Sequence, residues 1–302
     1  MRRTLPLLVM LACACGHRRY ERLDDAIVHT DRIGYTQAYW HRQLVAADFV
    51  RPGVKVSEII PDGAVLVDLT HAFAEDTVVW PSESRGFTLQ QIEHGRTDAG
   101  FYYESNRIST PEHAGTHLDA PRHFAQGKDG VDTLPLSRLM GPTVVIDISG
   151  KAAADRDAQL ERADVEAFER NNGRIDPGTI VLVRTGWDTR WPDRLRYLGD
   201  TRPGATDKLH FPGIAESAAN LLISRQVGAV GIDTASVDHG PSKDFKTHRA
   251  FADAGLPTFE NVARLDQLPV RGAVVLALPM KVAHASGAPL RVVAIMPQPV
   301  TR

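Results

Sequence analysis

The stretch from Asp164 to Arg184, DVEAFERNNGRIDPGTIVLVR, contains both kinds of element from which this chain builds its fold. Apolar side chains recur at helical spacing over residues 164–170, with Asp164 as the expected N-cap and Gly173 just past the end. Residues 179–184 form a continuous apolar, β-branched run. Runs of this kind are usually strands buried on both faces of a sheet. The stretch therefore predicts a helix followed by a buried strand.

The same alternation continues on both sides of this stretch. A second helical pattern covers residues 214–223. Further apolar runs predict strands at residues 65–69, 143–148, 229–232, 273–278 and 290–295. Strands that alternate with helices indicate an α/β protein. With 302 residues, of which 43% are hydrophobic, the chain can bury the core of one large domain or two small ones.

The charge and cysteine content argue against several classes of function. A net charge of −2 and the lack of a basic run give no reason to expect a nucleic-acid partner. Both cysteines, Cys13 and Cys15, lie near the start, so a metal site further along must use His, Asp and Glu. Such ligands favour zinc or manganese over iron–sulfur clusters or Cu(I). The sequence contains no GxSxG, P-loop, GxGxxG or HExxH motif, so those nucleophiles and cofactors are not expected.

Residues 1–15 have the features of an export signal, with two arginines, an apolar run at 5–14 and small residues at the end. The apolar run is too short to span a bilayer comfortably. An alanine before each cysteine resembles a bacterial lipoprotein processing site, which predicts a periplasmic or lipid-anchored protein attached to a membrane. A plain cleaved signal, or a start that is merely apolar, is the alternative, and the choice between Cys13 and Cys15 stays open.

The domain boundary is expected near residue 64. Residues 16–63 are predicted to form an N-terminal tether or helical arm, because residues 33–44 show a loose amphipathic spacing. A partly ordered linker is the alternative. The compact domain is then expected over residues 64–302.

The run HAGTHLDAPRH, residues 113–123, carries four potential metal-binding or catalytic side chains at odd positions. They are His113, His117, Asp119 and His123. In an extended strand they share one face at about 6.6 Å spacing, and they can lean together onto an ion because N and O ligands lie about 2.0–2.2 Å from a metal. Gly115 on the same face would leave room for that ion. Proline and glycine argue against a helix here, and solvated histidines on a polar loop are the plainer alternative.

The pattern His-x-Gly-Thr-His-x-Asp-x-Pro-x-His resembles the signature of the metal-dependent cyclase family, which includes bacterial kynurenine formamidase and isatin hydrolase. Further family-like blocks follow in family order: RTGW at 184–187, GIDTASVD at 231–238, KTHR at 246–249, FEN at 259–261 and SGAP at 286–289. The resemblance implies a swivelling β/β/α domain with a mixed, barrel-like sheet flanked by helices. Relatives are often dimers or larger, so a homo-oligomer is expected by analogy.

The resemblance also implies a metal site. His113, His117 and Asp119 would bind a first ion, and a second ion would share Asp119 and take His248 and Glu260, giving one or two Zn²⁺ or Mn²⁺ ions per chain. His123 matches a catalytic histidine that is not a ligand. A metal lowers the pKa of bound water from about 15.7 towards about 7. A nearby histidine can take the water proton and deliver it to a leaving nitrogen.

Residues that contact the substrate are less clear from sequence. Trp80 matches an aromatic-proline element that borders the substrate in relatives. Phe73, Phe101 and Tyr102 are expected to join it in an apolar wall, with ordinary core packing as the alternative. His239 lies in a loop with glycine and proline, where a substrate-facing role is plausible.

The leading hypothesis is a metal-dependent hydrolase of a non-peptide C–N bond in a small molecule, such as an aryl formamide or a cyclic amide (lactam). A cyclase or dehydratase that uses the metal as a Lewis acid is a second hypothesis. A metal-dependent small-molecule binding protein is a third. A proton shuttle at His123 favours an enzyme, because binding alone does not require one.

Overall fold

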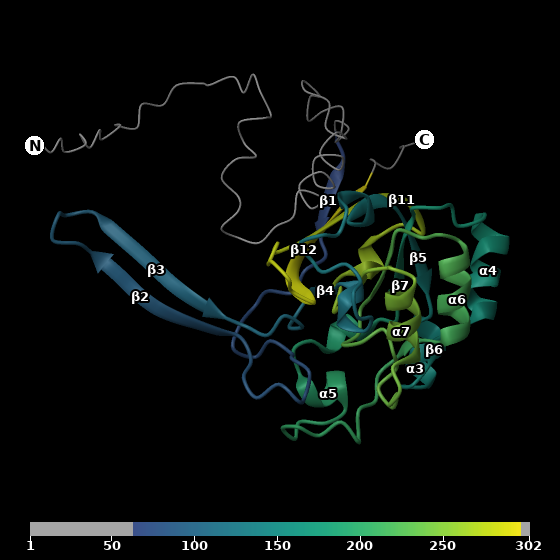
Figure 1. Ribbon diagram of the computed structural model, residues 1–302, viewed down its shortest axis with the longest axis horizontal. Coiled ribbons are helices and arrows are strands. Elements are labelled where there is room, and N and C mark those ends of the chain that lie inside the picture. The colour runs from purple at the N-terminus through teal and green to yellow at the C-terminus, as the bar shows by residue number, and fades with distance from the viewer. Residues whose placement is uncertain (1–62, 297–302) are drawn as a thin grey trace, which may run out of the picture. The chain divides into compact units, whose positions relative to one another are not determined.

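The structure is a computed structural model that describes residues 63–296 (Figure 1). The predicted export signal at 1–15 lies outside these residues, as does the predicted arm at 16–63 apart from Gly63. No helix within residues 63–296 is both long and apolar enough to cross a membrane.

The centre of the fold is a mixed sheet of eight strands, seven of which close into a barrel-like ring. The ring runs through β12 (Gly287–Met296), β11 (Arg271–Pro279), β5 (Met140–Asp147), β7 (Ile180–Arg184), β9 (Ala229–Ile232), β10 (Thr258–Glu260) and β4 (His117–Asp119), and returns to β12. β1 (Val65–Asp68) pairs with the C-terminal half of β12. β5, β7, β9 and β10 are parallel to one another, and the remaining pairings are antiparallel. The predicted α/β class with a mixed, barrel-like sheet is confirmed.

The helices lie outside the sheet. They are α3 (Ser149–Ala154), α4 (Arg162–Asn172), α5 (Arg194–Leu198), α6 (Glu216–Ser224) and α7 (Lys246–Asp253). Within residues 63–296 the chain also contains four short 3₁₀ helices between these elements and the strands: η2 (Pro121–His123), η3 (Leu136–Arg138), η4 (Trp187–Arg190) and η5 (Leu265–Gln267). α4 and α6 pack side by side along one face of the sheet (Figure 1). A separate two-stranded parallel pair joins β6 (Gln159–Leu160) to β8 (Gly213–Ile214).

Strand β7 shows why the apolar runs predicted buried strands. Ile180 and Leu182 pack in the cluster enclosed by the barrel. Val181 and Val183 belong to a second cluster, which also contains side chains of α4, α6 and α7. Both faces of this strand are therefore in the core, and an unbroken apolar run is what such a strand requires.

The predicted start of α4 is three residues late. The N-cap is Glu161, and Asp164 occupies the third helical position, where its side chain accepts a 2.7 Å hydrogen bond from the Glu161 N–H in a capping box. The end was predicted correctly, because Gly173 adopts φ 85° directly after Asn172.

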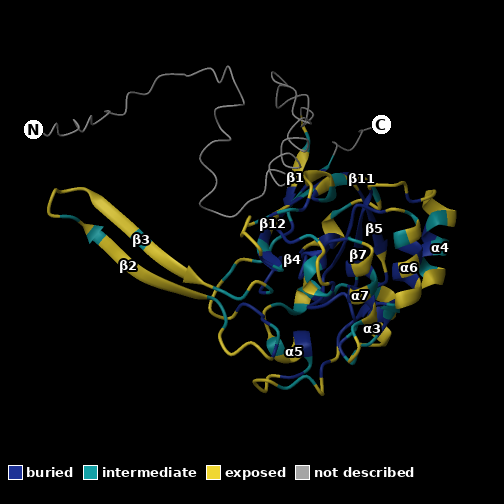
Figure 2. Ribbon diagram, in the orientation of Figure 1, coloured by how far each residue is buried: buried dark blue, intermediate teal, exposed yellow. Residues whose placement is uncertain are grey.

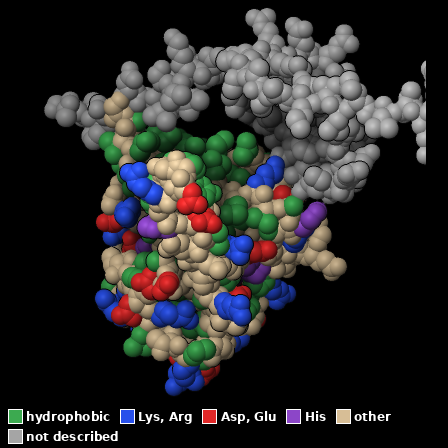
Figure 3. Space-filling view, turned by 90° about the vertical axis from the view of Figure 1, so that its left-hand side faces the viewer, with side chains coloured by type: hydrophobic (Ala, Val, Ile, Leu, Met, Phe, Trp, Pro, Cys, Tyr) green, Lys and Arg blue, Asp and Glu red, His purple; other side chains and the backbone are tan. Residues whose placement is uncertain are grey.

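A long hairpin of β2 (Thr88–Arg96) and β3 (Tyr102–Ser109) projects from the barrel and is exposed over almost its whole length (Figures 1 and 2). Phe101 and Tyr102 lie at its tip with 57% and 58% of their surface exposed. The expectation that these two residues line a substrate pocket is therefore wrong. On the side of the molecule from which the hairpin projects, acidic and basic side chains are interspersed over the surface (Figure 3).

Candidate metal centre and active site

The histidine-rich run is not one continuous strand. Gly115 adopts φ +55°, so the chain turns there and β4 covers only His117 to Asp119. The shared face predicted from odd positions therefore holds for this pair alone. The space expected beside Gly115 is not available to an ion, because a Cβ atom at this position would lie 2.7 Å from the ring of Phe73. The turns at Gly115 and at η2 bring the other histidines back towards β4.

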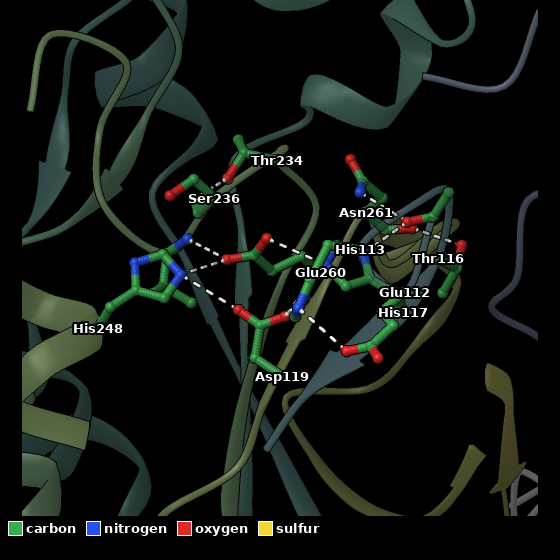
Figure 4. Close-up of polar contacts among 12 residues, drawn as sticks. Glu112, His113, Thr116, His117, Asp119, Thr234, Ser236, His248, Glu260 and Asn261 are labelled. Carbon is green, nitrogen blue, oxygen red and sulfur yellow. Dashed lines mark hydrogen bonds and ion pairs between the residues drawn. The ribbon is translucent and has the colours of Figure 1, made fainter. Parts of the chain in front are cut away.

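Pairing of β4 with β10 places a carboxylate beside this run. In the antiparallel register His117 lies opposite Glu260, and Asp119 lies opposite Thr258. His248 enters from the first turn of α7. Figure 4 shows these side chains converging on one point from three separate elements.

Asp119 is the centre of the cluster. Its Oδ1 lies 2.6 Å from His113 Nδ1 and 3.1 Å from His117 Nε2. Its Oδ2 lies 3.2 Å from His248 Nε2, and Glu260 Oε1 lies 3.0 Å from the same nitrogen. Two potential ligand groups therefore share Asp119, and in each group the ligand atoms lie within 4.8 Å of one another. One group contains His113, His117 and Asp119, and the other contains Asp119, His248 and Glu260.

The hydrogen bonds of two histidines aim their lone pairs into this cluster. His117 Nδ1 lies 2.9 Å from the Gly115 carbonyl, which can only accept a hydrogen bond, so Nδ1 carries the proton. His117 Nε2 is buried, lies 3.1 Å from Asp119 and 3.5 Å from Glu260, and has no hydrogen-bond partner among residues 63–296. A buried lone pair facing two carboxylates is unfavourable unless a cation lies between them.

His248 shows the same arrangement. Its Nδ1 lies 2.7 Å from Asp238 Oδ2, which leaves Nε2 directed at Asp119 and Glu260. A carboxylate that accepts the second N–H of a histidine is typical of metal ligands. The donor set of imidazoles and carboxylates, together with the partnerless His117 nitrogen, therefore fits a divalent metal.

Protons and a metal compete for these nitrogens. Burial lowers the pKa of His248, but its hydrogen bonds with Asp119, Asp238 and Glu260 outweigh burial and raise that pKa well above 6.5. For His117, Asp119 and Glu260 likewise outweigh the lowering effect of burial and raise the pKa. Metal binding must release these protons, so metal affinity falls with falling pH.

Two supporting carboxylates were not assigned roles from sequence. Asp238 orients His248 and also accepts a 3.1 Å hydrogen bond from the Thr247 N–H at the start of α7. Glu112 accepts hydrogen bonds from the Ser286 hydroxyl at 2.6 Å and its backbone N–H at 2.9 Å, and this hydroxyl lies 3.2 Å from His113 Nε2. The only signal for such partners in the sequence is that metal-binding histidines generally need one.

His123 lies next to the cluster but belongs to neither ligand group. It ends η2, and its ring stacks on that of His113 with centroids 3.8 Å apart. Burial lowers the pKa of His123 to about 4, the opposing effect of Asp119 being smaller. The ring is therefore neutral at pH 7 and can accept a proton.

A cavity of about 250 Å³ opens above the cluster and is lined by all six predicted metal-binding and catalytic residues. Trp80 also lines it, with Phe124 and Phe245, two aromatic residues that sequence reasoning did not select. Phe73 and His239 do not line this cavity. Phe73 packs against Gly115 instead, and its ring meets Phe87 at 5.5 Å.

Comparison with known proteins shows the family of this chain. Residues 67–239 match the family model described as "Putative cyclase". Isatin hydrolase from Roseibium aggregatum is 33% identical over 207 residues, which cover 66% of this chain and 77% of that protein. The chain belongs to the cyclase family.

Kynurenine formamidase from Salinibacter ruber is 28% identical over 228 residues, which cover 76% of this cyclase-family chain and 96% of that protein. The crystal structure of an isatin hydrolase bound to the product analogue thioisatinate superposes with a TM-score of 0.71 at 28% identity. That match covers 87% of this chain and 100% of the isatin hydrolase. The chain is thus an enzyme of the kynurenine formamidase and isatin hydrolase type.

Proposed function

We propose that this cyclase-family enzyme hydrolyses a non-peptide amide C–N bond in a small aromatic molecule, either an aryl formamide or a cyclic amide. The observation that carries the proposal is the neutral, stacked His123 at the edge of a metal-binding cluster, facing a cavity with aromatic walls. The names of the relatives support the two substrate types.

The metal would be held by His113, His117 and Asp119, with His248 and Glu260 completing a second group around Asp119. We propose Zn²⁺ or Mn²⁺, because both accept imidazole and carboxylate ligands. When bound, such an ion polarises the amide carbonyl and lowers the pKa of water.

The residues of the chain supply the proton transfers. A ring nitrogen of His123 takes a proton from the attacking water as the new C–O bond forms. The same proton then passes to the amide nitrogen as the C–N bond breaks, which gives a separate amine and acid from a formamide, or one ring-opened amino acid from a cyclic amide. Delivery of this proton is needed because an amide anion is a very poor leaving group.

The walls of the cavity would hold the substrate ring. Trp80, Phe124 and Phe245 present aromatic surfaces near the cluster, with centroid separations of 6.2 Å for Trp80–Phe245 and 5.4 Å for Phe124–Phe245. Burial of an aromatic ring there excludes water from the reacting carbonyl and fixes its direction.

The test is release of formate from aryl formamides, or of ring-opened acid from lactams, by protein loaded with Zn²⁺ or Mn²⁺ and by protein treated with a chelator. Metal-dependent release of acid and amine in equal amounts supports the proposal. A ligand that raises the melting temperature without any product would indicate a binding protein instead. Formation of a ring or loss of water would indicate a cyclase or dehydratase.

A further inference from the structure

Apart from histidines, the ionisable side chains that line the cavity are all carboxylates. Its described lining contains three carboxylates, Glu83, Asp119 and Glu260, and no lysine or arginine. Asp119 and Glu260 lie within 3.0–3.2 Å of histidine nitrogens in the metal cluster. Glu83 forms no ion pair with any residue between 63 and 296, so its charge can act on whatever enters the cavity.

The position of Glu83 is fixed by its backbone. Its N–H donates a 2.9 Å hydrogen bond to the Trp80 carbonyl, which closes a turn over residues 80–83. The Pro81 carbonyl in this turn accepts a 2.7 Å hydrogen bond from Gly204. The Trp80 indole packs against Phe211 and Phe245. The carboxylate is therefore carried on an anchored turn beside an aromatic wall of the cavity.

We propose that this enzyme takes aryl amides that are uncharged, or that carry an amine, on the part of the molecule away from the scissile bond, and that Glu83 disfavours substrates with a carboxylate there. This inference rests on the proposed function and narrows its substrate class. A distal carboxylate would lie near Glu83 with no lysine or arginine in the cavity lining to compensate, whereas a protonated amine would be attracted.

The strength of the effect follows from the exposure of Glu83. Because this side chain is solvent-exposed, water and salt screen its field. We expect a distal carboxylate to lower kcat/KM by about fivefold relative to a neutral group of the same size, and an ammonium group to raise it by about threefold.

Two matched pairs of para-substituted formanilides test this selection. The first compares 4-formamidobenzoate with 4-formamidobenzamide, which have similar size but differ in charge. The second compares 4-(aminomethyl)formanilide with 4-(hydroxymethyl)formanilide. The metal-loaded wild-type enzyme should prefer the benzamide in the first pair and the amine in the second. Both preferences should shrink by at least threefold in Glu83→Gln and reverse for the first pair in Glu83→Lys.

The control is Glu93→Gln, which removes one negative charge from the exposed hairpin and should leave both ratios unchanged. Equal turnover of benzoate and benzamide by the wild type, or ratios that do not respond to Glu83 substitutions, would overturn the inference. Binding of the amine and hydroxymethyl compounds is measured in parallel by calorimetry. If no formanilide is hydrolysed, the aryl formamide form of the proposed function fails, while the ratio of the two dissociation constants in wild type and Glu83→Gln still decides charge selection.

Discussion

Oδ2 of Asp238 accepts hydrogen bonds from both the backbone N–H and the ring Nδ1–H of His248, at 3.0 and 2.7 Å. One carboxylate oxygen thus fixes the start of α7 and the direction of a metal-binding side chain. Loss of the Asp238 charge should make both the start of α7 and the His248 side chain less well ordered.

Asp238→Asn is expected to weaken metal binding by about 10- to 100-fold, because the amide is a poorer partner for the imidazole N–H. Metal affinity is measured by competition with a chelating dye at constant pH. Asp244→Asn is the matched control, since Asp244 is exposed and its ion pair within residues 63–296 is with Lys246 at 3.4 Å. Equal affinity in Asp238→Asn and wild type would show that Asp238 does not position His248.

His123→Ala is expected to retain its metal and lose about 100- to 10,000-fold in kcat, because proton transfer is removed while the ligand groups remain. Metal content by mass spectrometry and turnover of an aryl formamide are measured on the same preparation. His210→Ala, a half-exposed histidine paired with Asp157, should change neither. Loss of metal from His123→Ala would mean that this residue is a ligand.

Gly287→Ala should damage the metal centre without changing a ligand. A Cβ atom at this position would overlap the His113 ring and lie 2.7 Å from the Leu118 carbonyl, which β4 holds in place. We expect a loss of about 1–3 kcal/mol in the free energy of unfolding, and at least tenfold weaker metal binding.

Gly150→Ala is the control for Gly287→Ala, because no atom beyond its chain neighbours and the backbone of α3 lies within 4 Å of the Cβ that it would add. It should leave metal affinity unchanged. Chemical denaturation and metal titration of both variants check the prediction. A Gly287→Ala protein with wild-type affinity would show that His113 is not held where the structure places it.

His71 should make the stability of the protein depend on pH. Its ring is stacked on Trp191 at 4.2 Å, and burial, assisted by Arg264, lowers its pKa to about 4 from an unfolded value of 6.5. Between these values the unfolded chain binds a proton that the folded chain does not. The stabilisation that comes from keeping His71 neutral is therefore complete above pH 6.5 and is lost as pH falls towards 4, by about 3 kcal/mol in total.

His71→Phe keeps the stacking and removes this titration. The difference in unfolding free energy between wild type and His71→Phe, measured on chelator-treated protein at pH 7.5 and at pH 4.5, should change by more than 1 kcal/mol. The same comparison with His94→Phe, on the exposed hairpin, should show no change. A pH-independent difference for His71→Phe would mean that the neutral form of His71 is not favoured by folding.

Sequence reasoning worked best where side chains face the core on both sides. The apolar run at 179–184 became β7, because its short length and β-branched side chains favour a strand over a buried helix. The hairpin β2–β3 was missed because solvent covers both of its faces, and its sequence shows no apolar alternation. Strands β4 and β10 have three residues each and are too short to show the alternation of apolar and polar residues that identifies a strand.

The side chains that meet in the candidate site could be selected from sequence, but not the way in which they meet. The alternation of side chains along a strand correctly placed His117 and Asp119 on one face. The left-handed conformation of Gly115 and the 3₁₀ turn at His123 depend on tertiary packing and could not be predicted in this way. The role of Asp238 could not be inferred because its partner, His248, is placed by α7 and not by a local motif. Phe73 shows the reverse case, since an aromatic side chain near the site serves to support Gly115.

The closure of the barrel has a consequence for the order of events in folding. β4 is held on one side by β10 and on the other by β12, which spans residues 287–296. Both neighbours come from much later in the sequence than β4, so a partly folded chain that lacks either pairing cannot hold His117 and Asp119 in this arrangement. The candidate site is therefore a product of ring closure, and its geometry should appear and disappear together with the whole sheet.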